Sequence, residues 1–112
     1  MFLAQSESGE KVAIKIVQKD SKHPQWERMA RQENSTIQYL ARFPQDNKRI
    51  IKHIMTVEND KEIGIVMEYA QGGDLFELVK RRGRLPETEA WRLFRQIIQG
   101  VKFIHGKHIC HR

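Results

Sequence analysis

The sequence predicts an α+β protein, in which an antiparallel sheet with one helix packed on it is followed by further helices. Two β-rich runs, RIIKHIMTV at 49–57 and EIGIVMEYA at 62–70, are joined by a tight polar turn. The segment at 10–17 alternates between two faces as a strand does, and apolar residues recur with helical spacing at 25–40 and 87–105.

The composition indicates one small folded domain or part of a larger one. Of the 112 residues, 39% are hydrophobic and 30% are charged, which is typical of a folded chain and argues against a disordered one. A single cysteine cannot form an internal disulfide, and no apolar run approaches the length of a membrane span. We therefore expect a cytoplasmic protein that binds no membrane.

The first element that the sequence predicts is a β-hairpin over residues 1–17, with a glycine-containing turn at SESGEK. In its second strand, EKVAIKIV, alternation places Ala13, Lys15 and Val17 on one face. Burying a lone charge costs on the order of several kcal/mol, so Lys15 needs an opposite partner if that face is buried.

A helix is predicted over residues 25–40, and it contains the charge that could serve as this partner. Glu33 continues the apolar stripe of the helix, so both side chains are explained if the helix packs on the sheet and Glu33 forms a salt bridge with Lys15. Alternatively, both side chains reach water at the edges of their elements. The apolar members of the stripe are Trp26, Met29, Ala30, Ile37 and Leu40.

The remaining elements are a central strand and two helices. The run at 63–70 is almost wholly apolar, and the glycine pair that follows it predicts a hinge. Asp74 is placed to cap a short helix that runs to about Arg82 and ends at Gly83. A longer helix is expected to have Pro86 in its first turn and to end at Gly106. It carries an apolar stripe of Ala90, Leu93, Phe94, Ile97, Ile98, Val101 and Ile104.

Two other features are candidates for binding sites. The segment HGKHICH offers four residues that bind zinc in other proteins, but structural zinc sites use two spaced ligand pairs and no second cluster exists, so we predict no metal site. The basic run KRRGR at 80–84 lacks the interleaved aromatic residues that stack on bases, so we predict a solvated helix end and no nucleic-acid binding. The four candidate zinc ligands are His105, His108, Cys110 and His111.

Five motifs occur in one order along nearly the whole chain: VAIK on a strand, the helix glutamate, IVMEYAQGGDLF, LFRQIIQGVKFIH and HICHR. Together they resemble the eukaryotic protein kinase domain, especially serine/threonine kinases of the calmodulin-dependent and energy-sensing groups. The lysine–glutamate pair and the catalytic-loop signature are general features of protein kinases. The resemblance implies a partial small lobe ending in the hinge at 1–70 and the start of the large lobe at 71–112.

The resemblance implies that the parent domain binds ATP with Mg²⁺ and transfers the γ-phosphoryl group to serine or threonine of a protein substrate. Counterparts of the glycine-rich loop, the catalytic aspartate and the Mg²⁺ ligands are not found in the 112 residues. We therefore expect a fragment truncated at both ends and inactive alone, with helix faces exposed for a partner or chaperone. The alternative is a non-catalytic, kinase-derived fragment that binds a partner.

The resemblance also implies catalytic roles for Lys15, Glu33, His111 and Arg112. Lys15 would hold the α- and β-phosphates of ATP, and Glu33 would hold Lys15 in position. Ala13 would be small so that the adenine ring can lie flat on it. His111 and Arg112 match the first two residues of the His-Arg-Asp motif, in which the arginine pairs with an activation-loop phosphate in many kinases.

The remaining implied nucleotide contacts come from the hinge and the residues after it. Met67 would be the gatekeeper at the back of the pocket. Glu68 and Ala70 would offer backbone C=O and N–H groups to the adenine edge. Asp74 would reach the ribose hydroxyls, and Leu75 would close the floor under the base.

Overall fold

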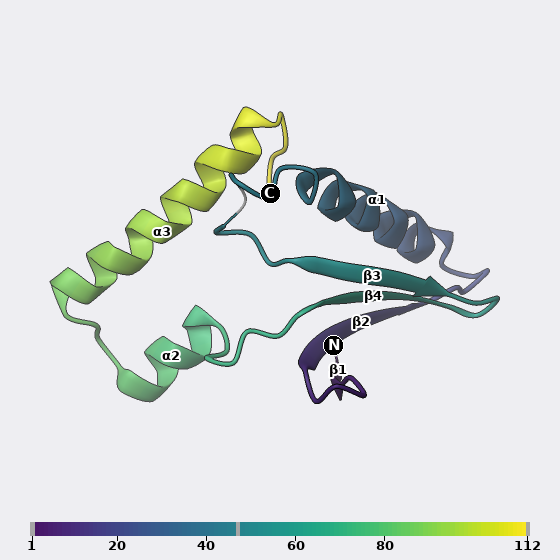
Figure 1. The fold of residues 1–112 in the computed structure, drawn as a ribbon, viewed down its shortest axis with the longest axis horizontal. Helices are drawn as coiled ribbons and strands as arrows, with labels where there is room; N and C mark the ends of the chain where they lie inside the picture. Colours follow the sequence, from purple (N-terminus) through teal and green to yellow (C-terminus); the bar gives the residue numbers. More distant parts are fainter. Residues whose placement is uncertain (1, 47, 112) are drawn as a thin grey trace. The chain divides into compact units, whose positions relative to one another are not determined.

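The computed structural model describes residues 2–46 and 48–111, which form two compact units (Figure 1). The first unit comprises the chain up to Pro44 together with Ile51–Tyr69, and the second comprises Gln45–Ile50 and the chain from Ala70 onward. The boundary between residues 70 and 71 that the sequence suggests stays a prediction.

The first unit contains a four-stranded antiparallel sheet with the order β1-β2-β4-β3. Its strands are β1 (Phe2–Gln5), β2 (Lys11–Gln18), β3 (His53–Glu58) and β4 (Glu62–Glu68). The predicted α+β class and the predicted first hairpin are therefore confirmed. β1 and β3 form the two edges, so β2 and β4 are the strands that position the central residues of the sheet.

Short polar turns close the two hairpins of the sheet. Between β1 and β2, Gly9 adopts a φ of 86° and donates its backbone N–H to the Ser6 carbonyl over 2.9 Å. Between β3 and β4, the side-chain oxygen of Asn59 accepts hydrogen bonds from the backbone N–H groups of Lys61 and Glu62, both at 2.8 Å.

The core of the first unit lies along β4, as its apolar sequence predicts. Ile63 and Ile65 are the largest fully buried side chains, and Val66 is also buried. Gly64 lies between Ile63 and Ile65 and opposite Val57 of β3. A Cβ atom added at Gly64 would meet Cγ2 of Val57 at 2.9 Å, which is closer than packed carbon atoms approach.

We expect Gly64→Ala to destabilise the protein by about 1–3 kcal/mol, because the added methyl group displaces Val57 or the backbone of β3. Chemical denaturation measures the effect. Gly72→Ala is the matched control, because a Cβ there would meet no atom within 4 Å. Equal stability of the two variants would contradict this account of the strand contact.

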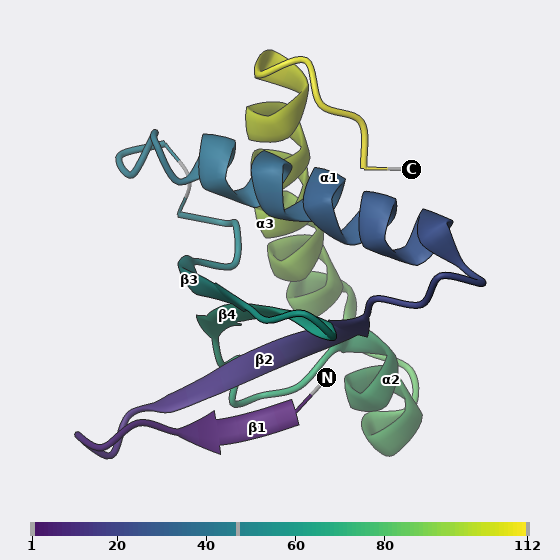
Figure 2. The ribbon, with the colours of Figure 1, turned by 90° about the vertical axis from the view of Figure 1, so that its right-hand side faces the viewer.

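The helix α1 (Pro24–Leu40) lies across one face of this sheet and contacts β2, β3 and β4 (Figure 2). Ala30 and Leu40 are buried, as predicted. The prediction that Trp26 and Met29 belong to the buried stripe is wrong, since both are exposed. The ring of Trp26 stacks on His23 with centroids 4.3 Å apart, so the first turn packs on the preceding connection rather than on the sheet.

The strand β3 begins at His53 and not at Arg49, which corrects the predicted start. The Arg49 guanidinium donates a hydrogen bond to Gln99 over 2.9 Å, within the second unit. β3 is also irregular between His53 and Met55: these residues lie opposite the adjacent residues Met67 and Val66 of β4, leaving one extra residue between them. This two-against-one pairing is a β-bulge.

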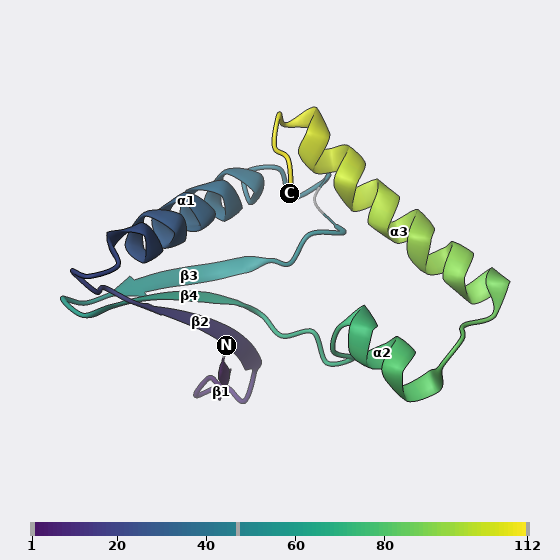
Figure 3. The same cartoon turned by 180° about the vertical axis from the view of Figure 1, so that it is seen from behind.

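The second unit contains α2 (Leu75–Arg82) and α3 (Glu87–Gly106), joined by a short connection (Figure 3). A carboxylate oxygen of Asp74 accepts the backbone N–H of Glu77 over 2.8 Å, so Asp74 caps α2 as predicted. Gly83 follows the last turn with a φ of 74°, as the predicted stop requires. None of the described helices is long and apolar enough to cross a membrane.

The start of α3 differs slightly from the prediction, and its end agrees with it. Pro86 precedes the helix as its N-cap and is not inside the first turn. Gly106 is the last helical residue, as predicted, and the left-handed conformation follows at His108, with a φ of 63°. Along the expected stripe, Phe94, Ile97 and Ile98 are exposed whereas Ile104 is buried; the expectation of exposure is therefore wrong for Ile104.

Candidate functional site

The predicted ion pair between Lys15 and Glu33 is present, with Nζ of Lys15 2.5 Å from Oε2 of Glu33. Lys15 comes from the interior strand β2 and Glu33 from the third turn of α1. Each side chain is 38% exposed, so the charges pair while remaining partly in water. At this exposure the pair contributes no more than about 1 kcal/mol to stability, and its main effect is to fix the direction of the ammonium group.

The strand surface around Lys15 combines a small residue with a fixed cation. Ala13 lies on the same face of β2 and opposite Met67 of β4. A flat apolar group fits over a residue as small as Ala13, and an oriented ammonium suits a phosphate. These residues therefore fit the base and phosphates of a nucleotide. The described residues contain no group of three or more His, Cys, Asp or Glu side chains placed to hold a metal ion.

At the end of β4, Glu68 is tied to the segment that leads into β3. Its backbone N–H donates to the Lys52 carbonyl over 2.9 Å, and its carboxylate accepts the Lys52 backbone N–H over 2.7 Å. The predicted hinge residue is therefore held through both its main chain and its side chain. The hydrogen bonds between Glu68 and Lys52 thus extend the pairing of β3 and β4 to Lys52, one residue before β3 begins.

The other predicted site residues belong to the second unit. The Ala70 carbonyl accepts a hydrogen bond from Gly73 over 3.1 Å. Asp74 caps α2, and Leu75 begins that helix with its side chain 42% exposed. His111 is exposed in the segment after α3. Arg112, the last of the predicted catalytic residues, lies outside the described residues. The nucleotide contacts expected of this group stay predictions.

Sequence reasoning missed a second ion cluster beside the Lys15–Glu33 pair. Glu58, at the end of β3, pairs with Arg31 of α1 and with Lys19, each over 2.6 Å. Arg31 also pairs with Glu27 one turn earlier in α1, over 2.7 Å. The only signal in the sequence is the Glu27–Arg31 spacing of four, which predicts a pair within the helix but not the link to β3.

We expect Glu58 to keep its charge down to unusually low pH. The hydrogen bonds from Arg31, and then from Lys19, lower the pKa of the Glu58 carboxyl from 4.5 to about 2. Because the pKa is lower in the folded state, the ionised carboxylate of Glu58 contributes to the free energy of unfolding. This contribution is complete above the unfolded pKa of 4.5 and disappears as pH falls from there to about 2. A carbon-13 NMR titration of Glu58 checks the prediction, and an ordinary midpoint near 4.5 would contradict it.

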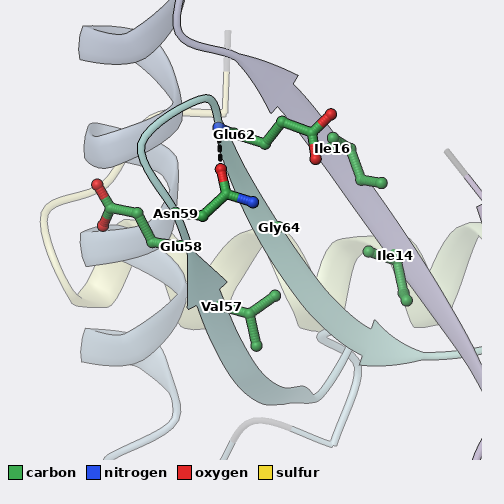
Figure 4. Close-up of a pocket in the computed structure, with 7 residues that line it drawn as sticks. All are labelled: Ile14, Ile16, Val57, Glu58, Asn59, Glu62 and Gly64. Carbon is green, nitrogen blue, oxygen red and sulfur yellow. Dashed lines mark hydrogen bonds between the residues drawn. The ribbon is translucent and has the colours of Figure 1, made fainter.

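A pocket of about 220 Å³ lies on the sheet face opposite to Lys15 (Figure 4). Its apolar lining comes from Ile14, Ile16, Val57 and Gly64. Figure 4 shows the Glu58 carboxylate pointing away from Ile14 and Ile16. None of the residues that line this pocket is among those predicted to bind a nucleotide, so the pocket is separate from the Lys15 surface.

Comparison with known proteins identifies the family. The model of the protein kinase domain matches residues 2–112. The chain is 37% identical to CBL-interacting protein kinase 8 of Oryza sativa subsp. japonica over 113 residues, covering 99% of the chain and 24% of that protein. It is 38% identical to a probable serine/threonine-protein kinase, fhkD, of Dictyostelium discoideum over 106 residues, covering 95% of the chain and 14% of the relative.

A third relative is CBL-interacting serine/threonine-protein kinase 16 of Arabidopsis thaliana, 37% identical over 106 residues, which cover 94% of the chain and 22% of the relative. The chain thus spans less than a quarter of the length of these curated relatives. Its sheet, with one packed helix followed by two further helices, is consistent with a kinase small lobe and the start of a large lobe. The chain belongs to the protein kinase family and is homologous to its serine/threonine kinases.

Proposed function

We propose that residues 1–112 form the ATP-binding half of a protein serine/threonine kinase domain, in which Lys15 holds the α- and β-phosphates and Glu33 orients Lys15. The observation that carries the proposal is the 2.5 Å ion pair between these two side chains, which join the sheet to α1. An oriented cation favours phosphate binding because it needs no rearrangement when the negative charge arrives. Ala13 and Met67 then lie beside the base.

ATP with Mg²⁺ supplies the phosphoryl group in this family, and a protein hydroxyl receives it. The residues of this chain hold and orient ATP, with Glu68 and Ala70 meeting the adenine edge, Asp74 the ribose and Leu75 the underside of the base. His111 and Arg112 begin the catalytic loop. We place the protein in the cytoplasm, since its single cysteine suits a reducing compartment.

The test begins with sequencing the transcript beyond the codon for Arg112. If the frame continues with an aspartate codon, the longer protein is expressed with and without Lys15→Ala. We expect labelled phosphate to pass from ATP to a generic serine/threonine substrate, and Lys15→Ala to lower the rate by at least roughly 10²–10³-fold. Transfer at the same rate in both proteins would contradict the role of Lys15.

A second candidate function is non-catalytic binding of a partner protein. It is favoured by the exposed apolar side chains of α3, among them Trp91 and Phe94. A stop codon after Arg112, together with co-purification of a defined protein that Phe94→Gln releases, would support this function. An aspartate codon and transfer that depends on Lys15 would favour the kinase instead.

A further inference from the structure

Two side-chain links join α1 to the edge strand β3, and neither involves Lys15. Nη2 of Arg31 donates to Oε1 of Glu58 over 2.6 Å, and the hydroxyl of Thr56 donates to Oδ1 of Asn34 over 2.5 Å. We call these four residues the α1–β3 clamp. They connect α1, which carries Glu33 of the Lys15–Glu33 pair, to β3, which carries neither member of that pair.

The local structure of both elements places the clamp residues together. Arg31 and Asn34 are three positions apart in α1 and therefore lie on one side of the helix. Thr56 and Glu58 are two positions apart in β3 and point to one face of the sheet, opposite Ile65 and Ile63 of β4. The clamp is thus a pairing of one helix side with one strand face.

Apolar packing by itself holds α1 weakly. Among the described residues of the helix, only Ala30 and Leu40 are buried, and one of them is the smallest apolar side chain. A helix with so few buried contacts can rotate or slide on the sheet at small cost in hydrophobic burial. Its orientation therefore depends on directional polar links to the strands.

The clamp and the Lys15–Glu33 pair act on different sides of α1. Arg31 and Glu33 are two residues apart, which corresponds to about 200° around the helix axis. A single ion pair allows α1 to rotate about that contact. Two contacts on different sides of the helix fix both its rotation and its distance from the sheet. Loss of either contact releases one degree of freedom of α1.

We propose that Glu58 is a positioning residue, which acts through Arg31 to hold α1 in the rotation that brings Glu33 to Lys15. The link to nucleotide binding rests on the proposed function, but the link to the position of α1 does not. Lys19 reinforces the arrangement from the sheet side, since its ammonium contacts Glu58 and the Asn59 carbonyl, each over 2.6 Å. Glu58 therefore joins α1 to the β3–β4 hairpin at one of the two links of the clamp, and Thr56 with Asn34 forms the other.

The chain offers a matched control for this proposal. Arg31 pairs with two carboxylates of nearly equal exposure, Glu27 at 37% and Glu58 at 38%. Glu27 is within α1, so Glu27→Gln removes one negative partner of Arg31 without breaking a link to the sheet. Glu58→Gln removes the other and breaks that link. A difference between the two variants therefore reports the contacts of Glu58 with Arg31 and Lys19, which Glu27 does not make with the sheet.

The position of α1 is measured as a distance distribution between spin labels at Lys11→Cys on β2 and Ser35→Cys on α1, in a Cys110→Ser background. We expect Glu58→Gln to broaden and shift the distribution and Glu27→Gln to leave it unchanged. A distribution unchanged by Glu58→Gln, or altered equally by Glu27→Gln, would overturn the proposal. Thr56→Val is a second variant, which removes the other link and should also broaden the distribution.

Affinity for ATP, measured on the same unlabelled variants, tests the consequence for Lys15. We expect Glu58→Gln to weaken ATP binding several-fold while Glu27→Gln does not. A shifted helix with unchanged ATP affinity would overturn the positioning role. If the wild-type chain binds no ATP, the proposed nucleotide site fails in this chain, and the spin-label distances still decide whether Glu58 positions α1.

Discussion

A polypeptide of residues 1–112 by itself is expected to transfer no phosphoryl group from ATP to a serine or threonine substrate. In-line transfer requires a group that accepts the hydroxyl proton and metal ions that neutralise charge on the phosphates. The resemblance to kinases predicts no counterpart, among the 112 residues, of the aspartate and asparagine that serve these purposes. Positioning of both reactants supplies about 7–11 kcal/mol of barrier lowering, and Lys15 with Glu33 can position only one of them.

The measurement is incorporation of labelled phosphate into a generic protein substrate, with an active kinase domain as the positive control. Lys15→Ala is the matched variant, since it removes the cation and leaves the remainder of the sheet intact. We expect both chains to give the background value. Incorporation above background that Lys15→Ala abolishes would show that the phosphates can be activated without the catalytic loop.

The second large effect concerns association of the 112-residue polypeptide. Four large apolar side chains of α3 are between 46% and 64% exposed, and the rings of Trp91 and Phe94 lie 6.1 Å apart. Burying the exposed part of each contributes roughly 1 kcal/mol, so covering all four contributes roughly 4 kcal/mol. We therefore expect a marginally stable chain that self-associates or binds a chaperone. The four side chains are Trp91, Phe94, Ile97 and Ile98.

Light scattering as a function of concentration measures the association. The double variant Phe94→Gln and Ile98→Gln removes two apolar side chains one turn apart on α3 and should shift the chain toward the monomer. Met29→Gln, on α1, is the control, because it removes an apolar side chain of 65% exposure from a different surface. A monomeric wild-type chain with a sharp cooperative melt, or an equal effect of the control, would contradict this account.

Interruptions of two apolar patterns made Lys15 and Glu33 candidates for an ion pair but left open that both side chains reach water, and the resemblance to protein kinases selected the pair. Sequence reasoning failed at Trp26 because periodicity does not show how many turns of the helix the sheet covers. At Met29 it failed because periodicity does not show how wide the covered side is: Met29 is 65% exposed, whereas the next residue, Ala30, is 2% exposed. It failed at the start of β3 because residues 49–52 are as β-rich as the true strand, while Arg49 bonds to α3.

The Glu58–Arg31 link was beyond sequence reasoning for a different reason. The chain has 20 basic and 14 acidic residues, so a surface carboxylate has many candidate partners, and only the packing of α1 selects one. The contact between His53 and Thr56, with Nε2 of His53 2.9 Å from the Thr56 hydroxyl, was equally hidden. Regular alternation would put residues three apart on opposite faces of a strand, and the bulge brings them to the same face.

The bulge also has a consequence for how this strand can change length during evolution. In a regular strand, an insertion or deletion of one residue exchanges the two faces of everything on one side of it. Ile54 is the extra residue in β3 and has no partner in the register with β4. Its deletion would leave His53 opposite Met67 and Thr56 opposite Ile65, with every side chain on its present face. Homologues one residue shorter at this point would therefore preserve the contacts between β3 and α1.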